Sequence, residues 1–241
     1  MRPRIRGGFV PFAGIRSAAV RLAIALLVGS VVFALARRGM GSALLLTPAD
    51  VLGRLWLWQP LTYGFVEASP MGVIFGALVL WQVGGGLEQM WGPRRLVTFA
   101  LGTTVLSGLL TVALAFVLPP LMLLQFPGGW VMASALWVAY GLSIGRAQTG
   151  VWGLPVSGNV LAAIGAGFVL LDGAFNGWLL VVPAVLGLAL SAIYVRGGRP
   201  ELWWLRFQSW RLQQRLRGRS KHLKVVAPDR NTSRNSDRFL H

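Results

Sequence analysis

The sequence of 241 residues has no cysteine, two histidines and few charged residues. Without cysteine there is no disulfide framework, thiolate metal site or cysteine nucleophile. Charged residues are 12% of the chain, whereas a soluble domain carries about a quarter. With 55% hydrophobic residues, the chain cannot cover its surface with polar groups, so the sequence predicts a protein embedded in lipid.

Motifs for metal or cofactor chemistry are also missing from the sequence. No carboxylate pair, cluster of metal ligands or glycine-rich phosphate loop occurs along the chain. We therefore expect neither a metal nor a cofactor.

Six apolar runs predict an all-α membrane protein with six transmembrane helices. A helix needs about 20 apolar residues to cross a bilayer, and most of these runs come close to that length. The six predicted spans are Ala18–Ala36, Met71–Met90, Leu96–Val117, Trp130–Ile144, Val151–Leu171 and Trp178–Val195.

The net charge of +16 comes from basic residues that flank the apolar runs. Five Lys/Arg lie in residues 1–21 and twelve in residues 196–241, without a nucleic-acid-binding motif, so no nucleic-acid partner is expected. The positive-inside rule predicts that both termini are cytoplasmic. An excess of Arg over Lys suggests a GC-rich genome, and hence a bacterial inner membrane.

The basic C-terminal region predicts a helix that lies on the membrane surface. Residues 196–218 carry apolar and basic side chains at helical spacing, which favours contact with anionic headgroups. A cytosolic helix that binds a partner is the alternative. The side chains expected at the membrane surface are Trp203, Phe207, Trp210, Arg206 and Arg211. Residues 1–17 are predicted to be a basic cytoplasmic segment, 18–195 the membrane domain and 219–241 a disordered polar tail.

Small residues four apart predict close helix packing within the membrane. The pairs Gly141/Gly145 and Gly187/Ser191 have the spacing that lets helix backbones approach. Polar residues inside or beside spans are costly in lipid, so each is a candidate for function. The possible contacts with a client or an interface are Trp58, Gln59, Glu67, Gln82 and Asn159.

The order of several short motifs resembles the rhomboid superfamily of intramembrane serine proteases and their inactive relatives. Trp58-Gln59 stands in an aromatic loop, Gly85-Gly86-Leu87-Glu88 ends the second span, and Gly92 with basic residues follows. Gly128-Gly129 precedes the short fourth span, and Asn176-Gly177 precedes the sixth. The resemblance implies a six-helix bundle over residues 18–195.

The catalytic residues that the resemblance implies are absent from the matching positions. The nucleophilic serine falls on Val131, and the histidine of the sixth helix falls on Leu179, or on Leu180 if the register shifts by one. The positions that help to bind the oxyanion fall on Gly72 and Gly76, and Trp58-Gln59 replaces the usual Trp-Arg pair. The resemblance therefore implies a member without the catalytic dyad.

The position of the histidines leads to the same interpretation. His222 and His241 both follow the last apolar run, so no base is expected near an intramembrane serine. We expect a derlin-like pseudoprotease that binds transmembrane segments of client proteins. The alternatives are a rhomboid-type serine endopeptidase with a non-standard active site and a structural subunit of a membrane complex.

The first prediction concerns proteolysis. The protein in liposomes should not cleave a generic rhomboid substrate, because its hydroxyls lack a base. Ser134→Ala and Ser143→Ala should leave this result unchanged. Cleavage by the unmodified protein that either substitution abolishes would contradict the pseudoprotease interpretation.

Overall fold

A computed structural model describes residues 17–36, 39–151 and 154–197. The chain divides into two units, Met1–Gly197 and Gly198–His241, and every described residue belongs to the first. The amphipathic helix and tail predicted after Gly197, including Trp203, Arg206, Phe207, Trp210 and Arg211, lie outside the described residues.

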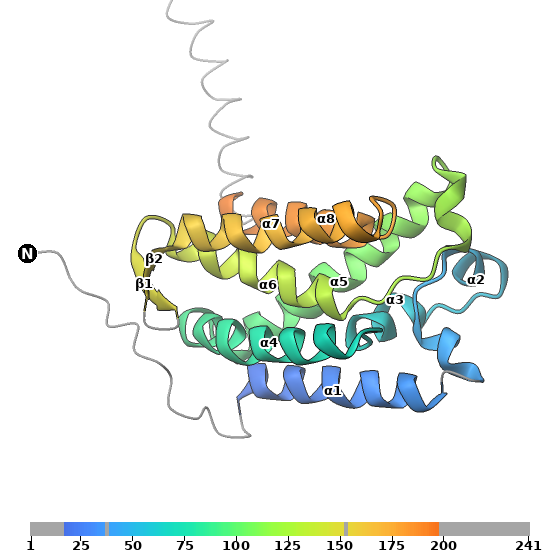
Figure 1. Ribbon diagram of the computed structural model, residues 1–241, viewed down its shortest axis with the longest axis horizontal. Helices are drawn as coiled ribbons and strands as arrows, with labels where there is room; N and C mark the ends of the chain where they lie inside the picture. The colour runs from blue at the N-terminus through green and yellow to red at the C-terminus, as the bar shows by residue number, and fades with distance from the viewer. Residues whose placement is uncertain (1–16, 37–38, 152–153, 198–241) are drawn as a thin grey trace, which may run out of the picture. The chain divides into compact units, whose positions relative to one another are not determined.

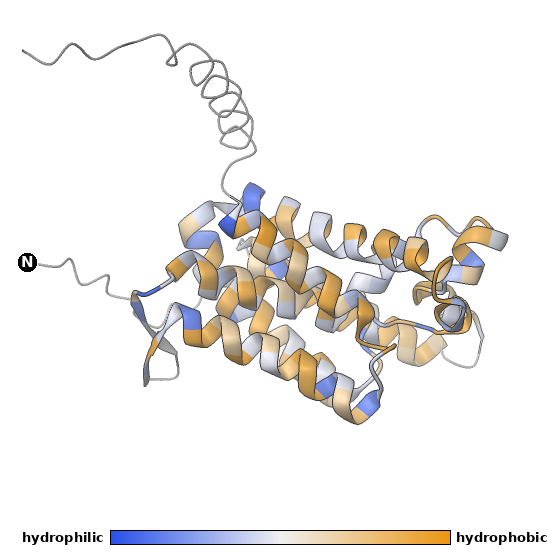
Figure 2. Ribbon diagram, turned by 90° about the horizontal axis from the view of Figure 1, so that it is seen from above, coloured by the Kyte–Doolittle hydropathy of each residue, from blue (hydrophilic) through white to orange (hydrophobic). Residues whose placement is uncertain are grey.

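Six larger helices run side by side in alternating directions in the described part of the chain (Figure 1). They are α1 (Ala18–Ala36), α4 (Pro70–Trp91), α5 (Pro93–Ala115), α6 (Gly129–Ile144), α7 (Gly158–Asn176) and α8 (Val182–Arg196). Orange apolar residues extend along these helices in Figure 2. The short elements are η1 (Met40–Leu44), α2 (Pro48–Gly53), α3 (Gln59–Thr62), η2 (Tyr63–Phe65), η3 (Pro119–Leu123), β1 (Gln148–Val151) and β2 (Leu154–Ser157).

The helix α6 forms the centre of this unit. It packs against α4, α5, α7 and α8, and its residues from Val131 to Ala139 are all buried. By contrast, α1, α4, α5 and α7 expose large apolar side chains on their outer faces. A buried helix surrounded by helices with apolar outer faces is the arrangement expected of a protein in lipid.

Four helices, α1, α4, α5 and α7, are long and apolar enough to cross a membrane, whereas α6 and α8 are shorter apolar helices. The first four have 19 to 23 residues, and α6 and α8 have 16 and 15. At about 1.5 Å per residue, α6 is roughly 24 Å long, less than the ~30 Å of hydrocarbon in a bilayer.

The prediction of a fifth helix from Val151 is wrong. Residues 148–151 pair in antiparallel fashion with residues 154–157, with Gln148 opposite Ser157, and α7 begins only at Gly158. Pro155 lies in β2, where its missing N–H breaks no helical hydrogen bond. The described part of the chain is therefore mostly helical with one small sheet.

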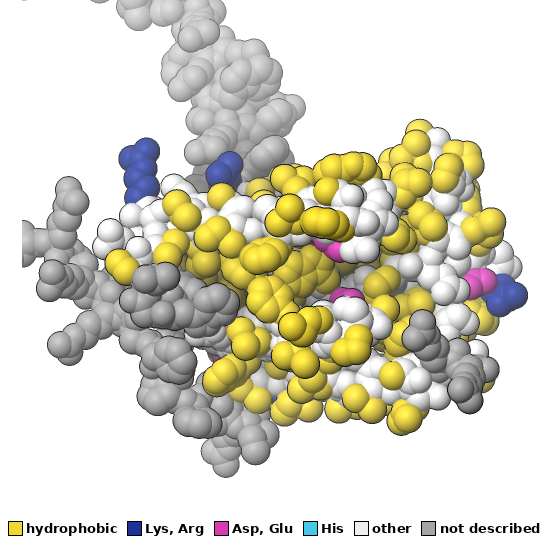
Figure 3. Space-filling view, viewed as in Figure 1, with side chains coloured by type: hydrophobic (Ala, Val, Ile, Leu, Met, Phe, Trp, Pro, Cys, Tyr) yellow, Lys and Arg dark blue, Asp and Glu magenta, His cyan; other side chains and the backbone are white. Residues whose placement is uncertain are grey.

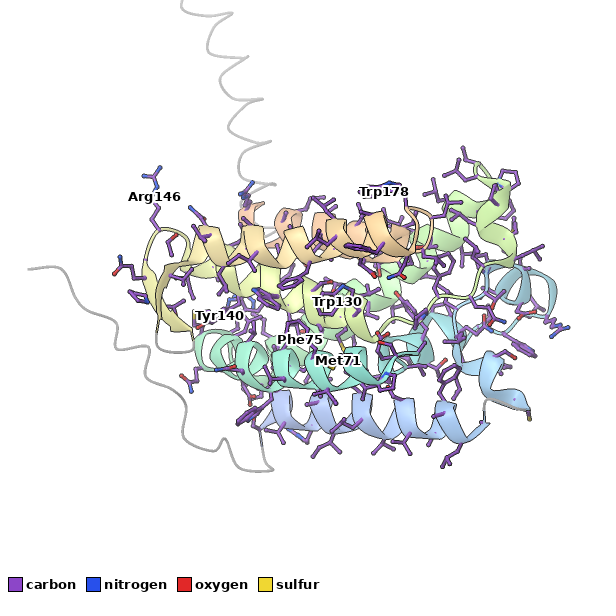
Figure 4. The ribbon with its side chains drawn as sticks, in the orientation of Figure 1. Met71, Phe75, Trp130, Tyr140, Arg146 and Trp178 are labelled. Carbon is purple, nitrogen blue, oxygen red and sulfur yellow. The ribbon has the colours of Figure 1, made fainter. Side chains whose placement is uncertain are left out.

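The two ends of the helices differ in charge. At one end, which we call the basic end, the last turn of α4 meets the start of α1, and the start of α5 meets the last turns of α8 through Arg95 and Tyr194. Arg94, Arg146 and Arg196 also lie at this end, and Figure 4 labels Arg146 beside the small sheet. The opposite end, the loop end, carries α2, α3, η1, η2 and η3.

The segment before α4 is buried at the loop end. Tyr63 is fully buried, and its hydroxyl contacts the carbonyl oxygen of Thr104 and the hydroxyl of Ser107 on α5. Its carbonyl oxygen accepts a hydrogen bond of 2.9 Å from the backbone N–H of Gly128, just before α6. An added Cβ at Gly128 would overlap the Tyr63 ring, so only glycine fits there. This segment fixes where α6 begins.

Gly141 and Gly145 have different roles. An added Cβ on Gly141 would lie 2.6 Å from both the Gly158 oxygen and the Ala162 nitrogen of α7, which explains the close approach. Gly145 has φ +64° and ends α6, so its role is termination and not packing. Gly187 and Ser191 are both buried on α8, and Gly187 faces Val131 of α6.

The contact between α6 and α7 can be tested with one methyl group. Gly141→Ala should lower the free energy of unfolding by about 1–3 kcal/mol, because the added carbon meets rigid backbone. The control Gly167→Ala has no neighbouring atom within 4 Å and should change stability by less than about 1 kcal/mol. Reversible unfolding in mixed micelles measures both. Equal effects of the two substitutions would contradict this packing.

Candidate functional site

A cavity of about 710 Å³ opens among α4, α6, α7 and α8 towards the loop end. The lining residues come from all four helices and from the segments that precede α4 and α6. Of these helices, α4 and α7 both pack on α6 but make no extensive contact with each other. Figure 3 shows yellow apolar side chains around this region, with acidic side chains in magenta among them.

Aromatic rings line the cavity between α4 and α7. Phe75 of α4 lies 5.7 Å from Trp130 of α6 and 5.7 Å from Phe168 of α7, measured between ring centroids. Trp137, about two turns further along α6, continues the cluster behind the cavity lining at 5.9 Å from Phe75. In Figure 4 the labelled Phe75 and Trp130 lie close together, with Met71 beside them on α4. These rings form an apolar wall that suits an apolar ligand.

Glu67 connects this cavity to the start of α6. One carboxylate oxygen accepts a hydrogen bond of 3.1 Å from the backbone N–H of Trp130, in the first turn of α6. The other accepts one of 3.1 Å from the N–H of Ala68. The N–H of Glu67 itself donates to the hydroxyl of Ser30 on α1, at 3.0 Å. The carboxylate thus satisfies an N–H that has no partner within the helix, where the helix dipole favours negative charge.

Asp172 is the second carboxylate at the cavity. It lies in the last turns of α7, and its Oδ1 accepts a hydrogen bond of 2.7 Å from the side chain of Asn176. Glu67, Asp172 and Asn176 all line the cavity, whereas no lysine, arginine or histidine does. The polar part of the cavity is therefore acidic.

Burial raises the pKa of the Glu67 carboxyl above its ordinary value of 4.5. The hydrogen bonds from backbone N–H groups act in the opposite direction, and the negative charge of Asp172 adds to the rise. The cost of desolvating the carboxylate exceeds what its hydrogen bonds recover.

The positions that the rhomboid resemblance assigned to catalysis hold no reactive group in the structure. Val131 and Gly72 line the cavity, and Gly76 is buried against Leu26 of α1. Leu179 and its alternative Leu180 lie in the turn before α8, and of the two only Leu180 lines the cavity. Since α8 begins only at Val182, Leu179 precedes this helix. The residues of α8 near Val131 are Ala184 and Gly187.

Other predicted contact residues lie away from the cavity. Trp58 is exposed in the loop and donates to the carbonyl oxygen of Ala43, and Gln82 is half-buried in α4. Asn159 is exposed in the first turn of α7, near the basic end. Gln59 is fully buried and accepts a hydrogen bond of 3.0 Å from the Thr47 N–H, so it holds the loop and is closed to a client.

The described residues contain no cluster of three or more His, Asp or Glu side chains that could hold a metal ion. Ser134 is fully buried and donates to the carbonyl oxygen of Val131, and the hydroxyl of Ser143 is buried without a hydrogen bond. Neither serine lines the cavity. Ser69 does, but its oxygen accepts a hydrogen bond from the Gly72 N–H and caps α4.

A family model described as eukaryotic integral membrane protein (DUF1751) matches residues 21–196, which is most of the chain and nearly all of its described part. The chain belongs to this family. A comparison with curated proteins finds no match.

Membership of the DUF1751 family confirms an integral membrane protein and corrects one prediction. The family is eukaryotic, so the prediction of a bacterial inner membrane is wrong. That prediction came from codon-driven composition alone. Arg, Ala and Gly are frequent in any GC-rich coding sequence, and they carry no physical information about which membrane holds the protein.

Sequence reasoning missed Phe75, Phe168 and Asp172 as members of the site. Each has an ordinary neighbourhood in the sequence, a phenylalanine in an apolar run or an aspartate in a turn. They come together only because α4 and α7 lie on either side of α6. The wide spacing of Glu67 and Asp172 along the chain contains no signal that they share a cavity.

The raised pKa of Glu67 makes a prediction about stability and pH. Below pH 4.5 this carboxyl is protonated in both the folded and the unfolded states. The contribution of the protonated Glu67 carboxyl to the free energy of unfolding is then fully present. This contribution is lost as the pH rises through the higher folded-state pKa. The difference in unfolding free energy between the unmodified protein and Glu67→Gln should therefore fall as the pH rises above 4.5 and through the folded-state pKa. A flat or rising difference would contradict the burial of this carboxyl.

Proposed function

We propose that this protein is a non-catalytic, rhomboid-like member of its family that binds transmembrane segments of client membrane proteins. The observation that carries the proposal is the aromatic cavity between α4 and α7, two helices that both pack on α6 but make no extensive contact with each other. A client helix can reach this cavity by moving sideways within the bilayer.

The aromatic wall supports binding of an apolar segment. Phe168 exposes 40% of its surface and Met71 76%, although both line the cavity. In lipid, helices associate through van der Waals packing and not through the hydrophobic effect, so a concave apolar wall with shaped rings favours association.

The proposed topology has six spans with both termini on the cytosolic side. The arginines of the basic end, Arg94, Arg95, Arg146 and Arg196, support this orientation through the positive-inside rule. For α6 and α8 to span, the bilayer must thin around them or polar neighbours must enclose their ends. The burial of α6 supports the second route for that helix.

The lack of a base supports a non-catalytic role. Within the described residues there is no histidine or lysine at all, and the hydroxyl of Ser69 at the cavity is already engaged as a helix cap. A serine endopeptidase would need Glu67 to take the proton, yet both of its oxygens accept backbone hydrogen bonds. A structural subunit anchored by residues 196–218 is the other alternative, and binding to isolated segments separates it from the proposal.

Site-directed crosslinking tests client binding. A photoreactive residue at Met71 should capture a single-pass Leu/Ala model peptide in proteoliposomes, and one at Val31 should not. Val31 is 55% exposed on the outer face of α1, so it is a control for random collisions in the bilayer. Phe168→Ala should weaken capture about tenfold, since loss of an aromatic anchor costs on the order of 1–3 kcal/mol. Equal capture from Met71 and Val31 would contradict the proposal.

A further inference from the structure

The two carboxylates at the cavity differ from the other acidic residues of the described chain. Asp50 forms an ion pair of 3.5 Å with Arg54, and Glu88 interacts electrostatically with Arg21 besides receiving three hydrogen bonds at the start of α1. Within residues 17–36, 39–151 and 154–197, neither Glu67 nor Asp172 forms an ion pair. The cavity thus holds negative charge without a described counter-charge.

The distribution of arginines explains why the charge stays uncompensated. All described arginines except Arg54 lie at the basic end, the length of a helix away from the cavity. The negative charge of Asp172 repels that of Glu67, and burial makes the Glu67 carboxyl costly to ionise. A cation brought by a ligand would reduce both costs.

The aromatic wall adds a second favourable contribution to the binding of a cation. Trp130, Phe75 and Phe168 line the same cavity as the two carboxylates. A cation within about 6 Å of the face of an aromatic ring gains on the order of 0.5–2 kcal/mol. Arg95 shows this interaction elsewhere in the protein, with its guanidinium 4.7 Å from the centre of the Trp91 ring.

We propose that this cavity selects client transmembrane segments that carry a lysine or arginine at the loop-end boundary of their apolar run. The proposal rests on the proposed function and names its client class. A basic side chain at that depth extends towards the membrane surface, where it reaches the carboxylates while its helix packs against the rings of α4 and α7.

The lining of the cavity favours a basic side chain over a phospholipid headgroup. A choline or ethanolamine headgroup brings a phosphate with its amine, and no lysine, arginine or histidine lines the cavity to pair with it. The phosphate would lie beside Glu67 or Asp172 and be repelled. A lysine or arginine side chain brings positive charge alone.

The test compares three model peptides that differ at one position. The full chain is reconstituted in phosphatidylcholine nanodiscs, and binding of a Leu/Ala peptide with Lys, Gln or Glu at the loop-end boundary is followed by fluorescence energy transfer. The lysine peptide should bind about tenfold more tightly than the glutamine peptide, which corresponds to about 1.4 kcal/mol. The glutamate peptide should bind more weakly than the glutamine peptide. Asp172→Asn should remove the preference for lysine, so that the lysine and glutamine peptides bind this variant with similar affinity.

Asp50→Asn is the matched control, because Asp50 is a loop-end carboxylate that does not line the cavity and pairs with Arg54. It should keep the full preference for lysine. Equal affinities for the three peptides would overturn this proposal and leave the proposed function intact, whereas no binding of any peptide would overturn both. A preference that survives Asp172→Asn combined with Glu67→Gln would also overturn it. Loss of the preference for lysine when phosphatidylethanolamine is added would also overturn the proposal, because it would identify a lipid amine as the occupant.

Discussion

The arrangement of this membrane domain depends on two carboxylates that bracket α4. Glu67, just before this helix, accepts a hydrogen bond from the first turn of α6, and Glu88, near its end, accepts hydrogen bonds of 3.0 Å from the N–H groups of Ala18 and Ala19. The first N–H groups of a helix have no partner within it, and lipid supplies none. One helix thus fixes the starts of two neighbours at opposite ends of the domain.

The late start of α6 follows from the same constraint and creates the cavity. Tyr63 and Glu67 hold residues 128–130, and α6 begins only there, deep between α4 and α8. A short central helix leaves space above its first turn, and aromatic rings from α4, α6 and α7 line that space without filling it. The group that caps α6 is therefore also part of the cavity, so changes in its protonation affect both stability and any ligand.

Charge is separated along the helices for two different reasons. Arginines at the basic end are exposed or stacked on aromatic rings, where they influence orientation in the membrane. Acidic groups at the loop end either pair locally, as Asp50 does, or face the cavity without a partner cation in the described chain. The first pattern concerns insertion, and the second, in our proposal, concerns recognition of a client.

The sequence by itself determined that this is a helical membrane protein, because apolar runs such as Ala18–Ala36 need no tertiary contact to favour a helix in lipid. It also determined the absence of histidine from the membrane region. Only the tertiary structure decided that residues 148–151 pair with residues 154–157, that Leu179 does not line the cavity and that Gln59 is buried. It also decided that Glu67, Phe75, Phe168 and Asp172 share one cavity. Hydropathy reports the average environment of a segment, whereas a site depends on which helix faces which, and that is set by close packing and by the few hydrogen bonds that lipid cannot replace.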